Sequence, residues 1–381
     1  MRYITASVVT FIIGSFAALA VAQTTEVSDF DQELRGFAAE LDSLRKAHRI
    51  PGLAVAVVRD QRLVMAKGYG SADADREVPV TPNTPFWIAS VTKTFVGLAF
   101  LHLEAEGRIK LSDRAAATPG FDDLCQWLAD SKLPFGEDLR CDAPITIRHI
   151  LNHQVQGEPG SRFLYNPIMY SRLSRYLEDK LGHGIEAVEG RHNILAQTID
   201  RVILKPGGMT RTMSSQWDRS RPLVYFDMAQ GFGVDEDGDW ITRPRPERHL
   251  AGGAGVVSTV EDLARYDIAI DRGVIAPPAT KKKLFAPARL NDGTISPYAF
   301  GWYVQNYRGV RLLWHAGWDE EAGFSALYLK VPDRNLTLIL LANGEGLYWK
   351  NPLDEAEVEK SPFAQAFLQR LVFRMAEEKR R

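Results

Sequence analysis

Hydrophobic residues follow different periods in different parts of the chain, and this predicts strands near both ends. Segment 29–48 carries apolar residues at helical spacing. Two β-rich runs follow at 53–58 and 63–67, separated by Asp60-Gln61 as in a hairpin. Near the other end, three apolar runs predict further strands and are followed by an amphipathic helix: 310–314, 324–331, 336–341 and 363–375.

The middle of the chain, from about 111 to 250, predicts short helices and loops instead. The elements expected there are three helices and a hairpin closed by Asp237-Gly238: 145–153, 170–181, 193–204 and 231–241.

This order of elements predicts an α/β fold. We expect strands from both chain ends to form one mixed antiparallel sheet that is flanked by helices. We assign about 23–110 and 251–381 to the α/β part and about 111–250 to a mostly helical part. An active-site cleft is expected between the two parts.

The first 22 residues resemble an export signal. They contain one arginine, an apolar run from Val8 to Leu19, and Ala20-Val21-Ala22 before Gln23. We expect cleavage after Ala22 and a periplasmic or secreted mature chain. A retained membrane anchor is the alternative, but the apolar run is short for a spanning helix. Elsewhere no apolar run reaches spanning length, so no stable span is expected in the mature chain.

Composition indicates an ordinary globular protein. Of 381 residues, 45% are hydrophobic and 25% charged, and the net charge is -2. No basic run is interleaved with aromatic residues, so no nucleic-acid surface is expected. Cys125 and Cys141 are the only cysteines. In an exported chain they predict a disulfide, with free buried thiols as the alternative.

Candidate chemistry begins at Ser90 and Lys93, three residues apart where a turn-rich loop gives way to a helix. Residues so spaced share a helical face, and a lysine of lowered pKa can help to deprotonate a serine. The same spacing recurs at Ser43 and Lys46, inside an ordinary amphipathic helix. Context therefore favours Ser90 as the nucleophile.

Other patterns have plainer structural explanations. His149 and His153 are spaced for a metal, but the glutamate of a His-Glu-x-x-His site is missing, which favours a helix-end role. Segment 235–239 lacks the ligand order of a calcium loop and is interpreted as a solvated turn. Segment 251–255 is glycine-rich but too irregular for a dinucleotide fingerprint, so backbone turn geometry is favoured. The chemistry implies no metal and no cofactor.

Several segments together resemble the serine β-lactamase and penicillin-binding-protein-like family, in the branch with class C β-lactamases, esterases and D-amino-acid peptidases. Their order and spacing carry the resemblance, which spans most of the mature chain. They include the nucleophile segment, the approach to a second motif at Tyr165, later landmarks and a third motif: 84–94, 145–153, 159–165, 206–212, 252–263 and 314–317.

The resemblance implies roles for individual residues. Ser90 corresponds to the acylated nucleophile and Lys93 to its proton partner. Tyr165 corresponds to a second base with phenolate character, and Tyr170 is its rival. The backbone N–H groups of Ser90 and Trp318 would form the oxyanion hole. The residues expected to bind substrate are His315, Ala316, Gly317 and Asn166.

Two departures from the family pattern shift the expected substrate. Pro167 stands where the second motif usually has an asparagine, and His315 replaces the lysine that meets a substrate carboxylate. A largely neutral histidine supplies no permanent anion-binding charge. We therefore expect an exported serine hydrolase that acts through an acyl-enzyme on esters or on small-molecule or peptide-like amides, as an esterase or D-amino-acid peptidase or carboxypeptidase. The alternatives are a β-lactamase proper, or a catalytically silent peptidoglycan- or peptide-binding protein. Trp314 and Trp318 are either cleft walls or core.

Overall fold

A computed structural model describes residues 13–73, 77–182, 193–214, 221–246 and 250–374, with side chains described from residue 29. The chain divides into two compact units. Met1–Leu44 and Pro362–Arg381 form one, which we call the terminal unit, and Arg45–Ser361 form the central unit. Among the described residues, no helix is both long and apolar enough to cross a membrane.

The terminal unit pairs the start of the chain with its end. Helix α1 (Ile13–Ala47) packs against α11 (Pro362–Phe367), with the rings of Phe37 and Phe367 5.8 Å apart. A π-helical turn, Leu368–Arg374, continues α11, so the predicted closing helix is present in two pieces. The export-signal prediction rests on residues 1–22, whose side chains lie outside the described residues, and it stays a prediction.

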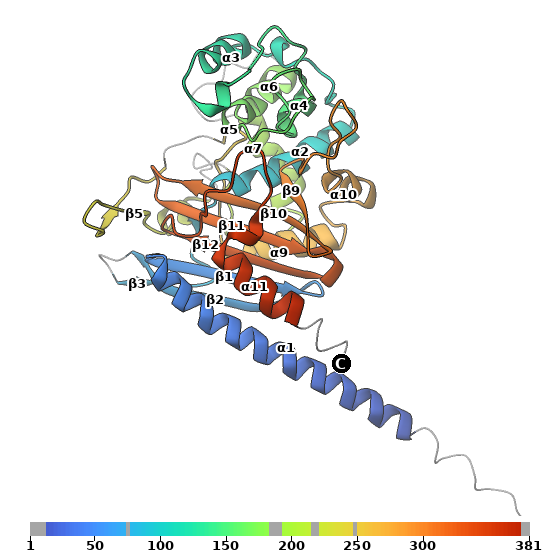
Figure 1. The fold of residues 1–381 in the computed structure, drawn as a ribbon, viewed down its shortest axis with the longest axis vertical. Helices are drawn as coiled ribbons and strands as arrows, with labels where there is room; N and C mark the ends of the chain where they lie inside the picture. The colour runs from blue at the N-terminus through green and yellow to red at the C-terminus, as the bar shows by residue number, and fades with distance from the viewer. Residues whose placement is uncertain (1–12, 74–76, 183–192, 215–220, 247–249, 375–381) are drawn as a thin grey trace, which may run out of the picture. The chain divides into compact units, whose positions relative to one another are not determined.

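The central unit is built on an eight-stranded antiparallel sheet that joins early and late segments (Figure 1). Strand β1 pairs with β12, with Leu53 opposite Ala342, which confirms that the two ends of the chain share one sheet. In sheet order the strands are β3 (Val78–Pro79), β2 (Arg62–Asp73), β1 (Gly52–Arg59), β12 (Leu336–Ala342), β11 (Phe324–Val331), β10 (Val310–Asp319), β9 (Trp302–Tyr307) and β8 (Tyr298–Ala299).

Helices, the β5–β6 hairpin and the β4–β7 strand pair complete the central unit. In Figure 1, α3, α4, α5 and α6 are grouped together away from the strands. The remaining elements are β4 (Phe86–Trp87), α2 (Thr92–Ala105), α3 (Phe121–Ala129), α4 (Ile147–Leu151), α5 (Pro167–Tyr170), α6 (Arg172–Leu181), α7 (Ile194–Ile199), α8 (Pro222–Phe226), β5 (Phe232–Val234), β6 (Trp240–Thr242), β7 (Val257–Ser258), α9 (Val260–Asp271) and α10 (Pro278–Leu284).

The core lies between the sheet and the helices α2 and α9. Strands β11 and β12 are buried along their whole length, as is nearly all of β1, which requires cover on both faces. Phe95 of α2 stacks on Tyr266 of α9 at 4.3 Å. Lys330 of β11 forms an ion pair with Asp267 of α9 at 3.0 Å. Helix α2, which follows Ser90, is thereby held to the sheet through α9.

Two strands are longer than predicted, and both extensions pass through glycine. The predicted run ends at residue 67, yet β2 continues through Gly68 and Gly70 to Asp73. A Cβ on Gly68 would lie 2.0 Å from the Val80 carbonyl, so glycine permits a close approach there. Strand β10 likewise continues beyond Trp314 to Asp319. A Cβ on Gly317 would lie 2.4 Å from the carbonyl of Ile88, two residues before Ser90.

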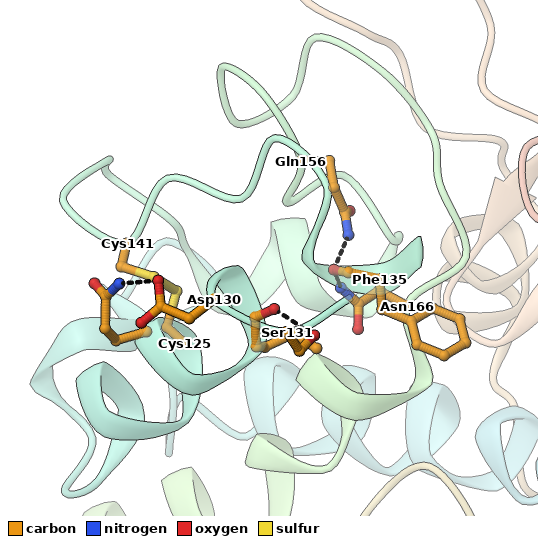
Figure 2. Close-up of a disulfide and its surroundings, with 9 residues drawn as sticks. Cys125, Asp130, Ser131, Phe135, Cys141, Gln156 and Asn166 are labelled. Atoms are coloured by element: carbon orange, nitrogen blue, oxygen red, sulfur yellow. Dashed lines mark hydrogen bonds between the residues drawn. A yellow bond between two sulfur atoms is a disulfide. The ribbon is translucent and has the colours of Figure 1, made fainter. Parts of the chain in front are cut away.

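The structure joins Cys125 of α3 to Cys141 in a disulfide, with the two Cα atoms 5.7 Å apart (Figure 2). The bridge closes a loop that contains the 3₁₀ turn η3 (Pro134–Gly136). This loop reaches the cavity described below.

Candidate active site

The nucleophile segment is held by contacts on both sides of Ser90. Phe86 pairs with Ser258, and the Ile88 N–H donates to the Val256 carbonyl at 3.2 Å. Ser90 lies in the 3₁₀ turn η1 (Ala89–Val91), which runs directly into α2. Ala89 has a φ of 44°, an uncommon conformation for a residue with a side chain. This turn places the half-buried Ser90 at the start of α2, facing the cavity.

Lys93 lies one helical turn beyond Ser90 and is completely buried. Its Nζ is 2.9 Å from Ser90 Oγ and 2.7 Å from the Gly253 carbonyl oxygen. Burial lowers the pKa of Lys93 well below its usual value. A neutral amine can donate to Gly253 and still offer its lone pair to the Ser90 hydroxyl. The arrangement therefore suits Lys93 as a general base.

The glycine loop has a site function that the sequence analysis did not assign. Gly252 and Gly255 have φ values of 98° and 139°, as expected for backbone turn geometry. However, Gly253 also supplies the carbonyl that orients Lys93. The Val256 N–H donates to the Thr92 hydroxyl at 3.2 Å, which ties the loop to α2. Interpreting this loop as turn geometry alone was therefore incomplete.

Tyr165 and Ser90 both line the cavity, whereas its rival Tyr170 is buried and is not one of the described lining residues. Lys93 Nζ lies 5.0 Å from the centre of the Tyr165 ring. Burial raises the pKa of Tyr165, and the nearby Ser90 hydroxyl only partly offsets this rise. Burial therefore favours the protonated phenol over the phenolate that the sequence suggested. Tyr165 therefore carries its proton in the resting state.

His315 lines the cavity, but both of its ring nitrogens are engaged inside the protein. Nδ1 lies 2.7 Å from the Ala316 carbonyl, which can only accept, so this nitrogen carries the proton. Nε2 then accepts from the Tyr298 hydroxyl at 2.9 Å. Burial, with Lys93 nearby, lowers the pKa of His315 to about 3. His315 is thus neutral, as the sequence suggested, and offers no charge to a substrate anion.

Asn166 does not lie where the sequence placed it. The residue is fully buried and is not one of the described residues that line the cavity. Its Oδ1 accepts from the Met169 N–H at 2.9 Å, and its Nδ2 donates to the Phe135 carbonyl at 2.9 Å. Asn166 is the N-cap of α5 and Pro167 occupies the first helical position. The assignment of Asn166 to substrate binding is corrected to a helix cap.

The histidine pair is also divided between two structural roles. The His149 ring accepts from the Thr146 N–H at 3.3 Å and completes a capping box at the start of α4. His153 Nδ1 accepts from the Asn166 N–H at 3.0 Å. No group of three metal-ligand side chains exists among the described residues.

Segment 235–239 forms the β5–β6 turn, where the Asp235 side chain accepts from the Asp239 N–H.

The cavity around Ser90 has a volume of about 850 Å³. The aromatic residues of its wall are Phe135, Tyr165, Tyr303, Trp314, Trp318 and Tyr348. Carboxylates are present at Asp319 and Glu320, and no arginine or lysine is found among the described residues of the wall. Trp314 and Trp318, which the sequence could assign either to a cleft wall or to the core, therefore both line the cavity. The Trp318 indole is 40% exposed and stacks on Tyr348 at 4.7 Å.

The third-motif residues lie on β10 next to the nucleophile turn. Ala316 and Trp318 line the cavity, and Gly317 allows the strand to approach Ile88 closely. The Trp87 indole donates to Asp319 at 3.2 Å, which fixes the end of β10 to the nucleophile segment. The oxyanion-hole role of the Ser90 and Trp318 N–H groups stays a prediction. By contrast, the Ser43 hydroxyl of the rival motif donates to the Ala39 carbonyl of its own helix at 3.4 Å.

Comparison with known proteins gives one family match over most of the chain. The family described as "Beta-lactamase" matches residues 37–360. "Protein flp" of Staphylococcus aureus (strain MW2) is 27% identical over 333 residues, covering 79% of this chain and 61% of that protein. A "D-aminopeptidase" of Gluconobacter oxydans (strain 621H) is 24% identical over 313 residues, covering 77% and 56%. This chain thus spans less than two thirds of either relative.

Solved structures with similar folds agree with this match. The octameric penicillin-binding protein homologue from Pyrococcus abyssi has a TM-score of 0.67 at 22% identity, with 88% of this chain and 77% of that chain covered. The D-amino acid amidase from Ochrobactrum anthropi SV3 has a TM-score of 0.63 at 17% identity, with 93% and 100% covered. At these identities the similarity concerns the fold.

Proposed function

Since the chain belongs to the β-lactamase family, we propose that it is a serine hydrolase acting through an acyl-enzyme on ester or amide substrates. The observation that carries the proposal is the position of Lys93. Its buried amine lies 2.9 Å from Ser90 Oγ, at the wall of a cavity large enough for a small molecule or short peptide.

In the proposed acylation step, Ser90 Oγ attacks the substrate carbonyl carbon while its proton passes to Lys93 Nζ. The carbonyl oxygen becomes an oxyanion, and we expect the backbone N–H groups of Ser90 and Trp318 to donate hydrogen bonds to it. Tyr165 carries its own proton and can pass it to the leaving nitrogen or oxygen as the bond to the carbonyl carbon breaks. The Lys93 ammonium then reprotonates Tyr165.

Deacylation follows the same route with water as the nucleophile. Lys93, neutral again, accepts a proton from water as the water oxygen attacks the acyl carbon. Breaking the bond to Ser90 Oγ returns that proton to the serine and releases the acid. Each residue is restored to its starting state, so the cycle needs no further reactant.

The charges of the cavity wall support esters and amides over β-lactams as the substrate class. A β-lactam carries a carboxylate, but His315 is neutral and the described wall has no arginine or lysine. Asp319 and Glu320 add negative charge instead. The names of two similar proteins, a D-aminopeptidase and a D-amino acid amidase, support amides as substrates.

A labelling experiment tests the enzyme against a catalytically silent binder. We expect a fluorophosphonate to label the purified protein and to lose this labelling in Ser90→Ala. Ser171→Ala is the matched control, because Ser171 lines the same cavity but donates to the Ile168 carbonyl at 2.6 Å. Labelling that survives in Ser90→Ala, or no labelling of the wild type, refutes the proposal. Fast turnover of a chromogenic cephalosporin would contradict the substrate preference.

We also propose that the chain is exported and cleaved after Ala22, on the strength of its N-terminal sequence. N-terminal sequencing of protein recovered from a secreting host should begin at Gln23. Recovery of an uncleaved, membrane-bound chain would support the anchor alternative.

A further inference from the structure

The loop closed by the Cys125–Cys141 disulfide carries one wall residue of the cavity. Phe135 lies in η3 and lines the cavity with Tyr165 and Ile168. In Figure 2, the Phe135 ring lies on the side of the loop away from the disulfide. A covalently closed loop thus presents an apolar ring to the space in which a substrate would bind.

Two buried amides fix the position of Phe135 relative to Tyr165. The Phe135 carbonyl accepts from Gln156 Nε2 at 2.8 Å and from Asn166 Nδ2 at 2.9 Å (Figure 2). Both donors belong to fully buried side chains, and Asn166 directly follows Tyr165. A shift of the loop would leave buried amide groups without a partner, which opposes such movement.

The other side of the loop is held by the disulfide and by close packing. A Cβ on Gly136 would lie 1.9 Å from the Leu128 carbonyl, so the loop backbone touches the end of α3. The Gly157 N–H donates to the Asp138 carbonyl at 2.8 Å. Leu133 directly precedes η3; it is 40% exposed and is not among the described residues of the cavity wall.

We propose that Phe135 is a specificity-determining residue that favours substrates with a bulky apolar group, and that the disulfide positions it. The proposal rests on the proposed function in one respect, that the cavity is the substrate site. Phe135, Pro167, Ile168 and Leu353 are apolar residues of the cavity wall. Pro167 and Ile168 closely follow Tyr165 in the chain, and the Leu353 carbonyl accepts from the Tyr165 N–H at 2.6 Å. An apolar substituent placed there loses contact with water, which favours its binding.

Binding in the Ser90→Ala background tests this inference without turnover. The probes are N-acetyl-D-phenylalanine amide and N-acetylglycine amide, measured by titration calorimetry. The ratio of their dissociation constants isolates the benzyl group. We expect Phe135→Ala to reduce the benzyl preference about tenfold, because the benzyl group loses most of its apolar contact with the Phe135 ring. The affinity for N-acetylglycine amide should stay within about twofold of its value with Phe135 present. Leu133→Ala, the matched control on the same loop, should leave the ratio unchanged.

The disulfide is tested by replacing both cysteines with serine in the same background. We expect the benzyl preference to fall in the same direction as in Phe135→Ala, with glycine amide binding retained. Equal losses for both probes in Phe135→Ala, or a Leu133→Ala effect as large as that of Phe135→Ala, overturn the inference. So does an absence of binding by both probes. If the benzyl preference is present while the wild type shows no labelling and no turnover, the proposed function fails and this inference stands.

Discussion

Replacing Lys93 with methionine tests the protonation state on which the proposed chemistry depends. Methionine keeps an apolar stem but removes the buried amine. Burial lowers the pKa of Lys93, so the folded state binds fewer protons than the unfolded state, whose lysine titrates near its ordinary value of about 10.4. Between these two pKa values, the wild type gains stability as the pH rises.

The size of this effect follows from proton linkage. One group that is neutral when folded and charged when unfolded contributes about 1.4 kcal/mol per pH unit within that window. Methionine binds no proton in either state, so its variant lacks the contribution. Loss of the amine also leaves the buried Gly253 carbonyl unpaired, which costs about 1–3 kcal/mol at every pH.

Urea unfolding of the wild type and Lys93→Met, from about pH 6 to about pH 9, measures the difference directly. We expect the stability of the wild type relative to the variant to increase with pH by up to about 1.4 kcal/mol per unit. Lys282→Met is the control, because Lys282 is exposed on α10 and its removal leaves no buried charge without a partner. A pH-independent difference for Lys93→Met would mean a charged Lys93, and the general-base role would be wrong.

The remaining predictions concern activity and the elements that support the site. Tyr165→Phe should lower kcat about 10²-fold for amides and less for esters with good leaving groups, because only the amide leaving group needs a proton from Tyr165. Steady-state kinetics on matched esters and amides test this prediction. Equal losses of kcat for the two substrate types would contradict it. Asn166→Ala removes the cap of α5 and the bond to Phe135, so it should lower the free energy of unfolding by about 1–3 kcal/mol in urea titrations, while an unchanged stability with a raised KM would restore a substrate role. Replacing Cys125 and Cys141 with serine should cost about 3 kcal/mol in the same assay, given their separation of 16 residues, and no loss would mean that the buried amides alone hold the loop.

Much of the sheet could be predicted because its central strands are continuously apolar. Strands β11 and β12 agree with the predicted runs to within one residue, and Leu53 of β1 pairs with Ala342 at the end of β12. The ends of β2 and β10 were not predicted, because glycines interrupt the apolar pattern there. Gly68 and Gly317 have no apolar side chain to extend the pattern, and tertiary contacts alone keep the chain extended there.

Some residues of the candidate site could also be predicted from the sequence, and others could not. Ser90 and Lys93 could be recognised because their spacing brings them together along one local element. Gly253 could not, because its contribution is a carbonyl 160 positions away in the chain that only the fold brings to Lys93. Tyr298, which donates to His315, belongs to a strand of two residues that is too short to produce a pattern.

The error at Asn166 had an available signal. An asparagine followed by proline is typical of an N-cap and the first helical position, and the structure uses both in this way. The resemblance to a family motif instead implies a substrate contact at this residue. The protonated state of Tyr165 had no such signal, because it results from burial, which a single residue in the sequence does not reveal.

The most direct measurement is to locate the acyl group of a trapped intermediate. The protein is mixed briefly with an activated ester, quenched in acid, digested and analysed by peptide mass spectrometry. We predict a single acyl group on the Ser90 peptide, absent in Ser90→Ala and strongly reduced in Lys93→Met. Acylation at another residue, or an equal yield without the Lys93 amine, would contradict a nucleophile activated by this lysine.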